Sequence, residues 1–346
     1  MVKKKVTFAD IAEYTGFSKT TVSRYFNDPD SLTVENQEKI AEALKALDYK
    51  ENKLAKVLAN GRTEFIGVIV PDLYMHYYSD MLSEIISTYE KYGYKFIVFA
   101  GNRDPEIERK YISELLAYNI EGLITLSHTL SSKELAAYNI PIVAIEREQQ
   151  HVCGITTDNY MGGVQAASLL VKSGCDIIIH VNGVLPKSMP AYGRIRGFKN
   201  FCEEHKIDHR IILTDMGNNF DENYAGILKL FKELEENYSG KTVGVFMPND
   251  TYANILLNII FEKYGKLPEK YKIVGFDDSP ISREAIIPIS TIGQQVSIMA
   301  DEAMQLLISQ MDEQKKRRPK PLSKPVNKVI TPILIVRDTA KPRSVS

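Results

Sequence analysis

From about Phe65 onward, short apolar runs alternate with amphipathic segments, and this alternation constrains the fold more than any other feature of the chain. The apolar runs have the length of strands, and the segments between them have the apolar spacing of helices. Strands that are apolar along their whole length are typical of parallel sheets covered by helices on both faces. Strands are predicted at residues 65–70, 94–101, 122–127, 141–146, 176–183, 210–215, 242–250 and 272–279, and helices at 78–92, 106–118, 163–171, 195–205, 222–236 and 252–264.

These strand–helix units predict an α/β fold with two doubly wound lobes. These units are too many for one six-stranded sheet, and their spacing is too irregular for a closed barrel. A chain of 346 residues has room for both lobes and a further small domain, at about 100–200 residues per domain. Because ligands bind at the carboxyl ends of such strands, the crevice between the lobes is the expected binding site.

Composition and charge indicate a globular protein of a reducing compartment. Hydrophobic residues make up 44% and charged residues 25% of the chain, which excludes a disordered or collagen-like protein. The net charge of -1 means that any basic surface must be local. Cys153, Cys175 and Cys202 have no spacing typical of disulfide frameworks or zinc sites. Asp10 and Glu13 interrupt any secretion signal, and no apolar run is long enough to span a membrane, so we expect a cytoplasmic protein.

The beginning of the chain differs in kind from the rest and predicts three short helices. Thr7 begins the first helix with a capping-box pattern, and Gly16 ends it. Ser18 is suited to cap a second helix over residues 19–26, and Thr33 a third. A tight glycine turn between the first two helices is typical of a helix-turn-helix module.

Residues 6–62 closely resemble the DNA-binding head of LacI (lactose repressor) family transcription regulators. The matching motifs are T-x-x-D-I-A at residues 7–12, G-F-S-x-x-T-V-S-R at 16–24 and Tyr-x-x-Asn at 49–52, before a short helix that ends in Leu-Ala. The resemblance continues to about Asp338 through marks that include residues 157–159, 194–198 and 275–278. It implies a helix-turn-helix head in front of a two-lobed core that resembles periplasmic sugar-binding proteins.

On this pattern we expect three parts. A helix-turn-helix domain takes residues 1–50, a hinge helix and linker take 51–62, and an effector-binding and dimerisation core takes 63–340. Within the core, lobe one is expected at about 63–160 and 293–323, and lobe two at about 161–292 and 324–340.

The second helix of the head is the expected DNA-reading element. Lysine and arginine donate to guanine, and threonine contacts a thymine methyl group or a phosphate. The resemblance implies base contacts by Lys19 and Thr20, with Arg24 on the same exposed side. Phosphate contacts are expected from Thr21, Ser23 and Thr33. The alternative is a solvated helix face.

Residues 52–60 predict a short helix that is marginal in isolation. The resemblance implies that it forms when two copies pair on DNA, with Leu58 wedged into the minor groove and Ala55 as its close-packing neighbour. Asn52 and Lys53 are expected near the DNA backbone. Glu51 stands where the family usually has proline, which brings a carboxylate near phosphate. An ordinary linker is the alternative.

The resemblance also implies an effector site in the crevice. Arg194 is expected to hold a hydroxyl, carboxylate or phosphate group, and Asp277 to accept from vicinal hydroxyls. Tyr77 and Tyr78 offer aromatic faces on which a sugar or base stacks. The remaining expected contacts are Asn249, Asp250 and Gln294. The alternatives are a surface ion pair for Arg194, helix caps for Asn249 and Asp277, and a core position for one of the tyrosines.

These features predict a repressor of carbohydrate-utilisation genes that a sugar or sugar derivative releases from its operator. A homodimer on a pseudo-palindromic DNA site is expected, because two recognition helices must reach successive major grooves. The alternative is a corepressor-dependent or global carbon regulator that binds DNA more tightly with a ligand or a phosphocarrier protein. A transport component and an enzyme are remote alternatives, and no catalytic residue, cofactor or metal site is predicted.

Three further features are assigned no function. Gly240-Lys241-Thr242 is similar to the end of a phosphate loop, but Glu235 stands where that loop requires glycine. The basic segment Lys315–Lys320 is typical of a solvated loop, with a second phosphate contact as the alternative. His128 and His180 are expected at strand ends facing the crevice, as structural residues.

Overall fold

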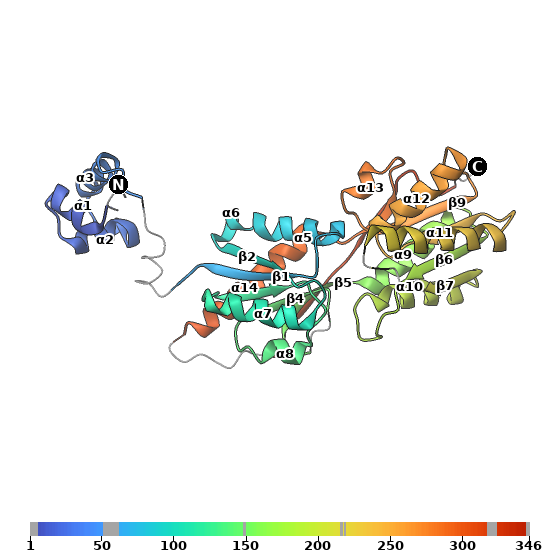
Figure 1. Ribbon diagram of the computed structural model, residues 1–346, viewed down its shortest axis with the longest axis horizontal. Coiled ribbons are helices and arrows are strands. Elements are labelled where there is room, and N and C mark those ends of the chain that lie inside the picture. Colours follow the sequence, from blue (N-terminus) through green and yellow to red (C-terminus); the bar gives the residue numbers. More distant parts are fainter. Residues whose placement is uncertain are drawn as a thin grey trace. The chain divides into compact units, whose positions relative to one another are not determined.

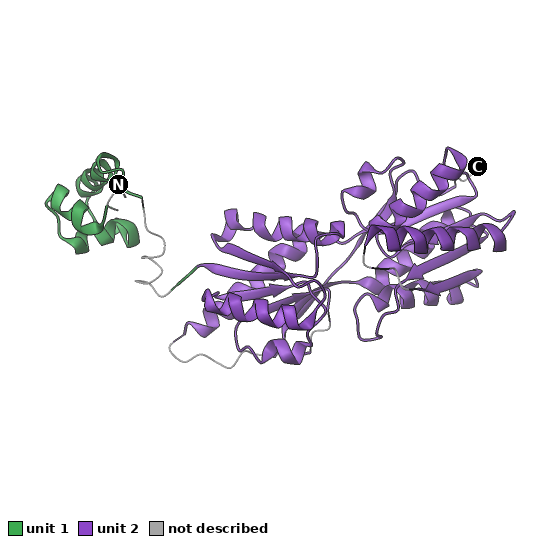
Figure 2. Ribbon diagram, viewed as in Figure 1, with its two compact units in different colours: residues 1–63 green, residues 64–346 purple. Residues whose placement is uncertain are grey.

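The structure, a computed structural model, describes residues 6–50, 62–147, 150–214, 217, 219–316 and 324–343. Two compact units comprise residues 1–63 and 64–346 (Figure 2). The predicted hinge contacts Asn52, Lys53, Ala55 and Leu58 lie outside the described residues, as do residues 317–320 of the basic segment. Within the described ranges, no helix combines the length and apolar character needed to span a lipid bilayer.

The first unit contains the three predicted helices. They are α1 (Phe8–Thr15), α2 (Lys19–Asn27) and α3 (Val34–Ala46), with a short 3-10 helix, Pro29–Ser31, before α3. The Ser18 hydroxyl accepts from the N–H of Thr21 and caps α2. Gly16 ends α1 with φ +73°, a left-handed conformation that glycine adopts without strain. Ile11, Val22 and Ile40 are fully buried at the centre of this unit, so its three helices share one core.

The second unit contains two six-stranded sheets. The first sheet has the strand order β11-β5-β4-β3-β1-β2, and its paired strands run parallel. The second has the order β12-β10-β9-β8-β6-β7, in which only β12 runs antiparallel, to β10. The first sheet comprises β1 (Phe65–Val70), β2 (Lys95–Ala100), β3 (Gly122–Thr125), β4 (Ile142–Ile145), β5 (Cys153–Thr157) and β11 (Asn327–Ile330). The second comprises β6 (Ile177–Asn182), β7 (His209–Leu213), β8 (Val243–Phe246), β9 (Tyr271–Asp277), β10 (Ser290–Gly293) and β12 (Ile333–Ile335).

Helices lie on both faces of each sheet (Figure 1), as the apolar strands predict. The first lobe has α5 (His76–Ser87), α6 (Tyr89–Tyr92), α7 (Pro105–Ala117), α8 (Ser132–Ala136) and α14 (Val296–Gln314). The second has α9 (Asn159–Lys172), α10 (Tyr192–Glu204), α11 (Phe220–Asn237), α12 (Asp250–Tyr264) and α13 (Ile281–Glu284). The predicted fold class, a helix-turn-helix head with a two-lobed core of parallel sheets, is confirmed.

The chain passes between the two sheets three times: from β5 to α9, from β10 to α14 and from β11 to β12. The sequence predicts that residues 324–340 belong to lobe two. The structure differs, because β11 pairs with β5 in the first sheet and β12 pairs with β10 in the second. Pro332 separates the two strands, and proline has no backbone N–H with which to continue a ladder.

Helices α9 and α10 approach each other closely through two glycines. A Cβ on Gly197 would lie 1.9 Å from the carbonyl oxygen of Tyr160, and one on Gly163 would lie 2.2 Å from the carbonyl oxygen of Arg194. Both obstacles are backbone atoms, which move only if a helix moves. The two glycines therefore set the distance between the helices and the position of Arg194.

We expect Gly197→Ala to lower the free energy of unfolding of the second unit by about 1–3 kcal/mol, because the added methyl group overpacks the helix pair. Gly226→Ala is the matched control: Gly226 lies in α11, and its Cβ would meet no atom within 4 Å. That substitution is expected to stabilise by about 0.5–1 kcal/mol, because alanine restricts the unfolded chain. Urea unfolding followed by circular dichroism measures both, and equal effects would contradict the close approach.

Candidate functional site

Helix α2 of the first unit presents the side chains predicted to read bases. Lys19, Thr20 and Arg24 are exposed, whereas Val22 is fully buried. The hydroxyl of Ser18 accepts from the N–H of Thr21 at 3.1 Å and so fixes the first turn of the helix. One face of α2 is thus anchored in the core, and the other carries two cations and a hydroxyl.

The three predicted phosphate contacts lie at the surface but are already engaged within the unit. The Thr21 hydroxyl lies 2.9 Å from that of Ser18, and the Ser23 hydroxyl accepts from Asn27 Nδ2 at 3.1 Å. Thr33 caps α3 by accepting from the N–H of Asn36 at 3.4 Å. An accepting hydroxyl keeps its own proton to donate, so Ser23 and Thr33 each retain a donor for a phosphate oxygen.

In the second unit, Arg194 of α10 is buried and held on three sides. Its Nε donates to Asn159 Oδ1 at 2.6 Å, and its Nη1 donates to the carbonyl oxygen of Pro248 at 2.7 Å. The guanidinium carbon lies 3.5 Å from the centroid of the Phe276 ring. Nη2 has no hydrogen-bond partner in the described part of the chain, so the side chain is fixed and still has a donor to offer.

Asp277, at the carboxyl end of β9, lies near Arg194. Gln294 Nε2 donates to Asp277 Oδ1 at 2.6 Å, and Gln294 Oε1 accepts from the Thr157 hydroxyl at 2.7 Å. Burial raises the pKa of Asp277 to about 7, although Arg194 and the bond from Gln294 oppose the shift. No described residue donates to Asp277 Oδ2, which leaves one acceptor for a ligand hydroxyl.

Glu146, Thr157 and Asn159 join this cluster and are not among the predicted contacts. Glu146 follows β4, and its carboxylate accepts from Asn159 Nδ2 at 2.9 Å and from the N–H of Thr157. All three residues are buried. Their position in the sequence could have indicated them. Glu146 ends one apolar run, and parallel strands bring their carboxyl ends to one edge of the sheet.

The two predicted aromatic contacts lie at the start of α5, with ring centroids 5.5 Å apart. The buried Tyr77 hydroxyl has no hydrogen-bond partner among the described residues. Burial and the nearby Glu146 and Asp277 carboxylates raise the pKa of Tyr77 well above its usual range. Tyr78 packs against the cores of both lobes, and burial raises its pKa to about 12. Because an unpaired buried hydroxyl is costly, Tyr77 is the better candidate for a ligand contact.

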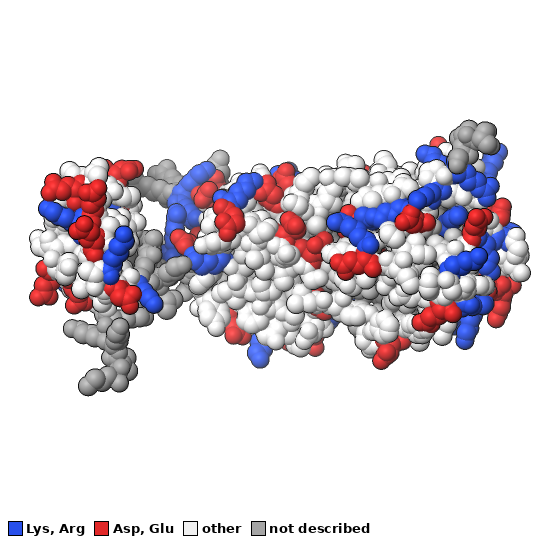
Figure 3. All heavy atoms as spheres, turned by 90° about the horizontal axis from the view of Figure 1, so that it is seen from above, with Lys and Arg blue, Asp and Glu red and all other residues white. Residues whose placement is uncertain are grey.

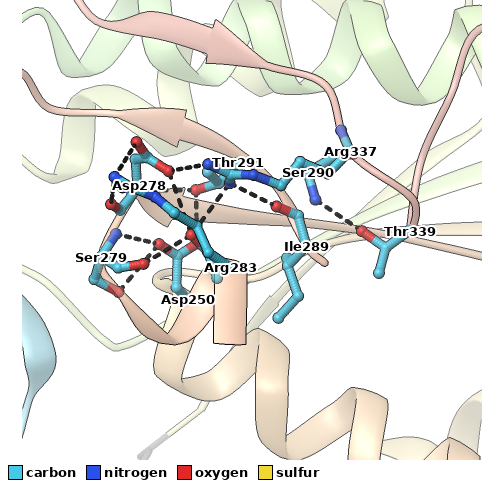
Figure 4. Close-up of polar contacts among 10 residues, drawn as sticks. Asp250, Asp278, Ser279, Arg283, Ile289, Ser290, Thr291, Arg337 and Thr339 are labelled. Carbon is cyan, nitrogen blue, oxygen red and sulfur yellow. Dashed lines mark hydrogen bonds and ion pairs between the residues drawn. The ribbon is translucent and has the colours of Figure 1, made fainter. Parts of the chain in front are cut away.

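Asp250 is predicted to contact the effector, but its carboxylate is bonded within the second lobe instead. It is fully buried, and Figure 4 shows it inside a polar network of the second lobe. Its Oδ2 accepts from the N–H of Ser279 at 2.8 Å, and its Oδ1 accepts from the Thr291 hydroxyl at 2.6 Å. Both carboxylate oxygens are therefore engaged within the lobe, and Asp250 holds the loop that follows Asp277.

Asn249 serves as a helix cap, which is one of its expected alternatives. Its Oδ1 accepts from the N–H of Tyr252 at 2.9 Å at the start of α12. Its Nδ2 lies 4.0 Å from Met75 Sδ of the first lobe. Asn249 is therefore positioned by its cap, with the amide group directed at the segment that precedes Tyr77.

The two histidines have different surroundings. His180 is buried, with Nδ1 3.1 Å from the carbonyl oxygen of Phe246 and its ring stacked on the Phe246 ring. Burial lowers the pKa of His128 to about 4, helped by Arg147 and Arg103, and its Nδ1 has no partner among the described residues. His180 is thus a satisfied core residue, and His128 is a neutral one.

Models of known protein families match most of the chain. The model of "Bacterial regulatory proteins, lacI family" matches residues 7–52. The model of "Periplasmic binding proteins and sugar binding domain of LacI family" matches residues 63–221. The "Periplasmic binding protein-like domain" matches residues 167–339.

Curated relatives cover most of the chain at moderate identity. The sucrose operon repressor of Streptococcus mutans is 29% identical over 310 residues, which are 88% of this chain and 92% of that protein. The ribose operon repressor of Halalkalibacterium halodurans is 28% identical over 97% of both chains. The lac repressor dimer bound to operator and the anti-inducer ONPF has the same fold, with a TM-score of 0.79 and 24% identity over 97% of this chain and 99% of that chain.

We expect the free energy of unfolding to depend on the ionisation of Asp277. Its pKa rises from an ordinary 3.8 to about 7 on folding, so the folded state holds the proton longer than the unfolded chain. The contribution of this group to stability therefore falls as pH rises from about 4 to about 7, by a few kcal/mol at about 1.4 kcal/mol per pKa unit.

Asp277→Asn removes this titration and keeps an oxygen for Gln294, so the variant is expected to lose less stability than the wild type between pH 5 and pH 8. Urea unfolding at each pH measures the difference. Asp312→Asn, the same change at an exposed carboxylate, is expected to follow the wild type. A parallel pH dependence for wild type and Asp277→Asn would refute the role given to Asp277.

Proposed function

The chain belongs to the LacI family of bacterial regulatory proteins, and we propose that it represses carbohydrate-utilisation genes until a sugar or sugar derivative releases it from its operator. The observation that carries this proposal is the combination of two parts in one chain. A helix-turn-helix unit presents Lys19, Thr20 and Arg24, and a two-lobed core gathers polar side chains at the carboxyl ends of its strands.

The polar cluster around Arg194 and Asp277 favours a ligand with several hydroxyl groups. Nη2 of Arg194 can donate to such a group, Oδ2 of Asp277 can accept from one, and the Tyr77 hydroxyl can do either. These groups have rigid supports, because Asn159 and Gln294 hold two of them in place. Relatives that carry the names sucrose operon repressor and ribose operon repressor support a sugar.

On DNA, we expect a homodimer that binds a pseudo-palindrome through two copies of α2. The hinge residues Asn52, Lys53, Ala55 and Leu58 are expected to form a helix in the complex, with Leu58 in the minor groove. The protein would act in the cytoplasm, where the genes lie, and by binding alone, without catalysis.

Release would follow from a change in the lobe arrangement. A ligand held by Arg194 and Asp277 of the second lobe and by Tyr77 of the first favours the arrangement in which all three reach it. That arrangement separates the paired hinges and withdraws Leu58 from the DNA. By thermodynamic linkage, operator DNA must weaken ligand binding by the same factor.

Corepression is the second candidate function. The alternative predicted from the sequence is a corepressor-dependent or global carbon regulator. The similarity to catabolite control protein A of Staphylococcus epidermidis, 27% identical over 322 residues, favours a role in carbon control. The two functions differ in sign: an inducer raises the operator Kd, and a corepressor lowers it. Titrating the ligand into the protein–operator complex distinguishes them.

We expect one class among sugars, sugar phosphates and sugar acids to raise the thermal unfolding midpoint of dialysed wild-type protein, because a ligand of the native state stabilises it by mass action. Arg194→Ala should abolish that shift, since it removes the fixed donor. Arg196→Ala changes a neighbouring arginine of α10 that lies over the Tyr160 ring, and it should keep the shift. An equal shift in Arg194→Ala would place the ligand elsewhere.

The DNA-binding surface is tested with a duplex that the wild-type protein selects from random sequence. Lys19→Ala and Thr20→Ala should each weaken binding by about 1–3 kcal/mol, because a base contact is lost. Lys39→Ala removes the same charge from α3, where Glu35 pairs with it at 3.0 Å, and should bind as the wild type does. Fluorescence anisotropy gives the Kd values.

The hinge is tested with the same duplex. Leu58→Ala should weaken operator binding and leave the ligand-induced thermal shift unchanged, because the wedge contacts DNA alone. Wild-type operator affinity in this variant would contradict the hinge role.

A further inference from the structure

The second lobe has a pocket of ≈ 340 Å³ that the proposed function does not use. It lies at the amino ends of β8 and β9, so it occupies the sheet edge opposite to that of Asp277. Lys and Arg side chains gather at the end of this unit near the last described residues (Figure 3). The cations that line the pocket are Lys241, Lys270, Lys272, Lys341 and Arg343.

Separate segments of the chain converge on this pocket and are bonded to one another. The C-terminal segment is fastened to the end of α9, where the N–H of Arg343 donates to the carbonyl oxygen of Lys172 at 2.9 Å. Nη2 of Arg343 donates to the carbonyl oxygen of Gly174 at 2.8 Å. Gly174 has φ +78°, and a Cβ there would overlap the Arg343 side chain. The pocket is therefore formed by tertiary contacts and not by one mobile tail.

The positive charge of the pocket is not fully balanced. Lys241 pairs with Asp208 at 3.4 Å and Lys341 with Asp338 at 2.5 Å. Glu235 is shared between Lys270 and another lysine, Lys263. One carboxylate, that of Glu269, is among the lining residues.

Lys272 and Arg343 have no carboxylate partner in the described part of the chain. Both line the same pocket. Both also oppose the effect of burial on the pKa of the Cys175 thiol, whereas the Asp176 carboxylate reinforces that effect. Lys272 is half-buried on β9. A partly desolvated cation without a counter-charge is stabilised strongly by an anion that pairs with it.

We propose that this pocket binds a small anion with two linked phosphate groups, of the pyrophosphate or bisphosphate type. Two unbalanced cations from different segments match two phosphate groups, and a concave pocket suits a small molecule. Recognition comes mainly from side chains, because two backbone donors of the turn Gly240-Lys241-Thr242 are already engaged. The N–H of Thr242 donates to Asp176 at 2.7 Å, and that of Lys241 donates to the carbonyl oxygen of Tyr238 at 3.1 Å.

The test is isothermal titration calorimetry of the full chain with pyrophosphate at constant ionic strength. The wild type is expected to bind with a Kd that rises with salt, and Lys272→Gln/Arg343→Gln to bind at least tenfold more weakly. Lys110→Gln/Lys133→Gln removes two exposed cations from the first lobe and should bind as the wild type does. Lys272→Gln alone, expected to weaken binding at least threefold, serves if the double variant does not fold.

Two further measurements distinguish binding in this pocket from binding at Arg194 and from nonspecific binding of anions. Arg194→Ala should bind pyrophosphate as the wild type does, whatever its response to sugars. Inorganic phosphate should bind at least tenfold more weakly than pyrophosphate. The proposal is overturned if the wild type binds no pyrophosphate, if the pocket variants keep wild-type affinity, if Arg194→Ala loses binding, or if the two anions bind equally.

Discussion

The fixed position of the Arg194 guanidinium is the interaction on which the rest of the second unit depends. A buried cation is tolerated only where hydrogen bonds and opposite charge surround it. Here Asp277 supplies the opposite charge, Asn159 and the Pro248 carbonyl accept the hydrogen bonds, and the Phe276 ring faces the guanidinium. Its helix can approach α9 that closely because residue 197 has no side chain. The close packing of α9 and α10 therefore also explains why the Arg194 guanidinium is buried with Nη2 free to donate.

The residues around Arg194 also belong to the segments that join the lobes. Thr157 and Asn159 lie where the chain leaves β5 for α9, and Gln294 lies where it leaves β10 for α14. Thr157 and Gln294 are bonded to each other at 2.7 Å. The third passage, after β11, leads to Arg337, which pairs with Asp278 at 2.5 Å (Figure 4). A ligand that pairs with Arg194 and Asp277 thus contacts residues that are bonded to the segments joining the lobes. Ligand binding can therefore change the arrangement of the two lobes.

The parts of the structure that could be predicted are those with a local or periodic signal. Long apolar runs gave the central strands, and Thr7, Gly16, Ser18 and Thr33 marked the ends of helices in the first unit. Strands β5 and β10 have no such run, because glycine, serine and threonine make up most of their residues. Only their pairing with strands on both sides defines them. Glu146 and Asp250 are both acidic residues that follow strands, so the sequence does not distinguish them. Only tertiary contacts place Glu146 in the cluster around Arg194 and Asp250 in the hydrogen-bond network with Ser279 and Thr291. Partners far apart in sequence, such as Thr157 and Gln294, have no local signal.

The central claim is that a sugar binds between rigidly held groups of the two lobes. The most direct measurement is a co-crystal structure of the full chain with the sugar that raises its thermal midpoint most. The account predicts ligand hydroxyls within hydrogen-bond distance of Arg194 Nη2 and Asp277 Oδ2, with Tyr77 closing the site from the first lobe. A sugar bound elsewhere, with these atoms facing water, would contradict it.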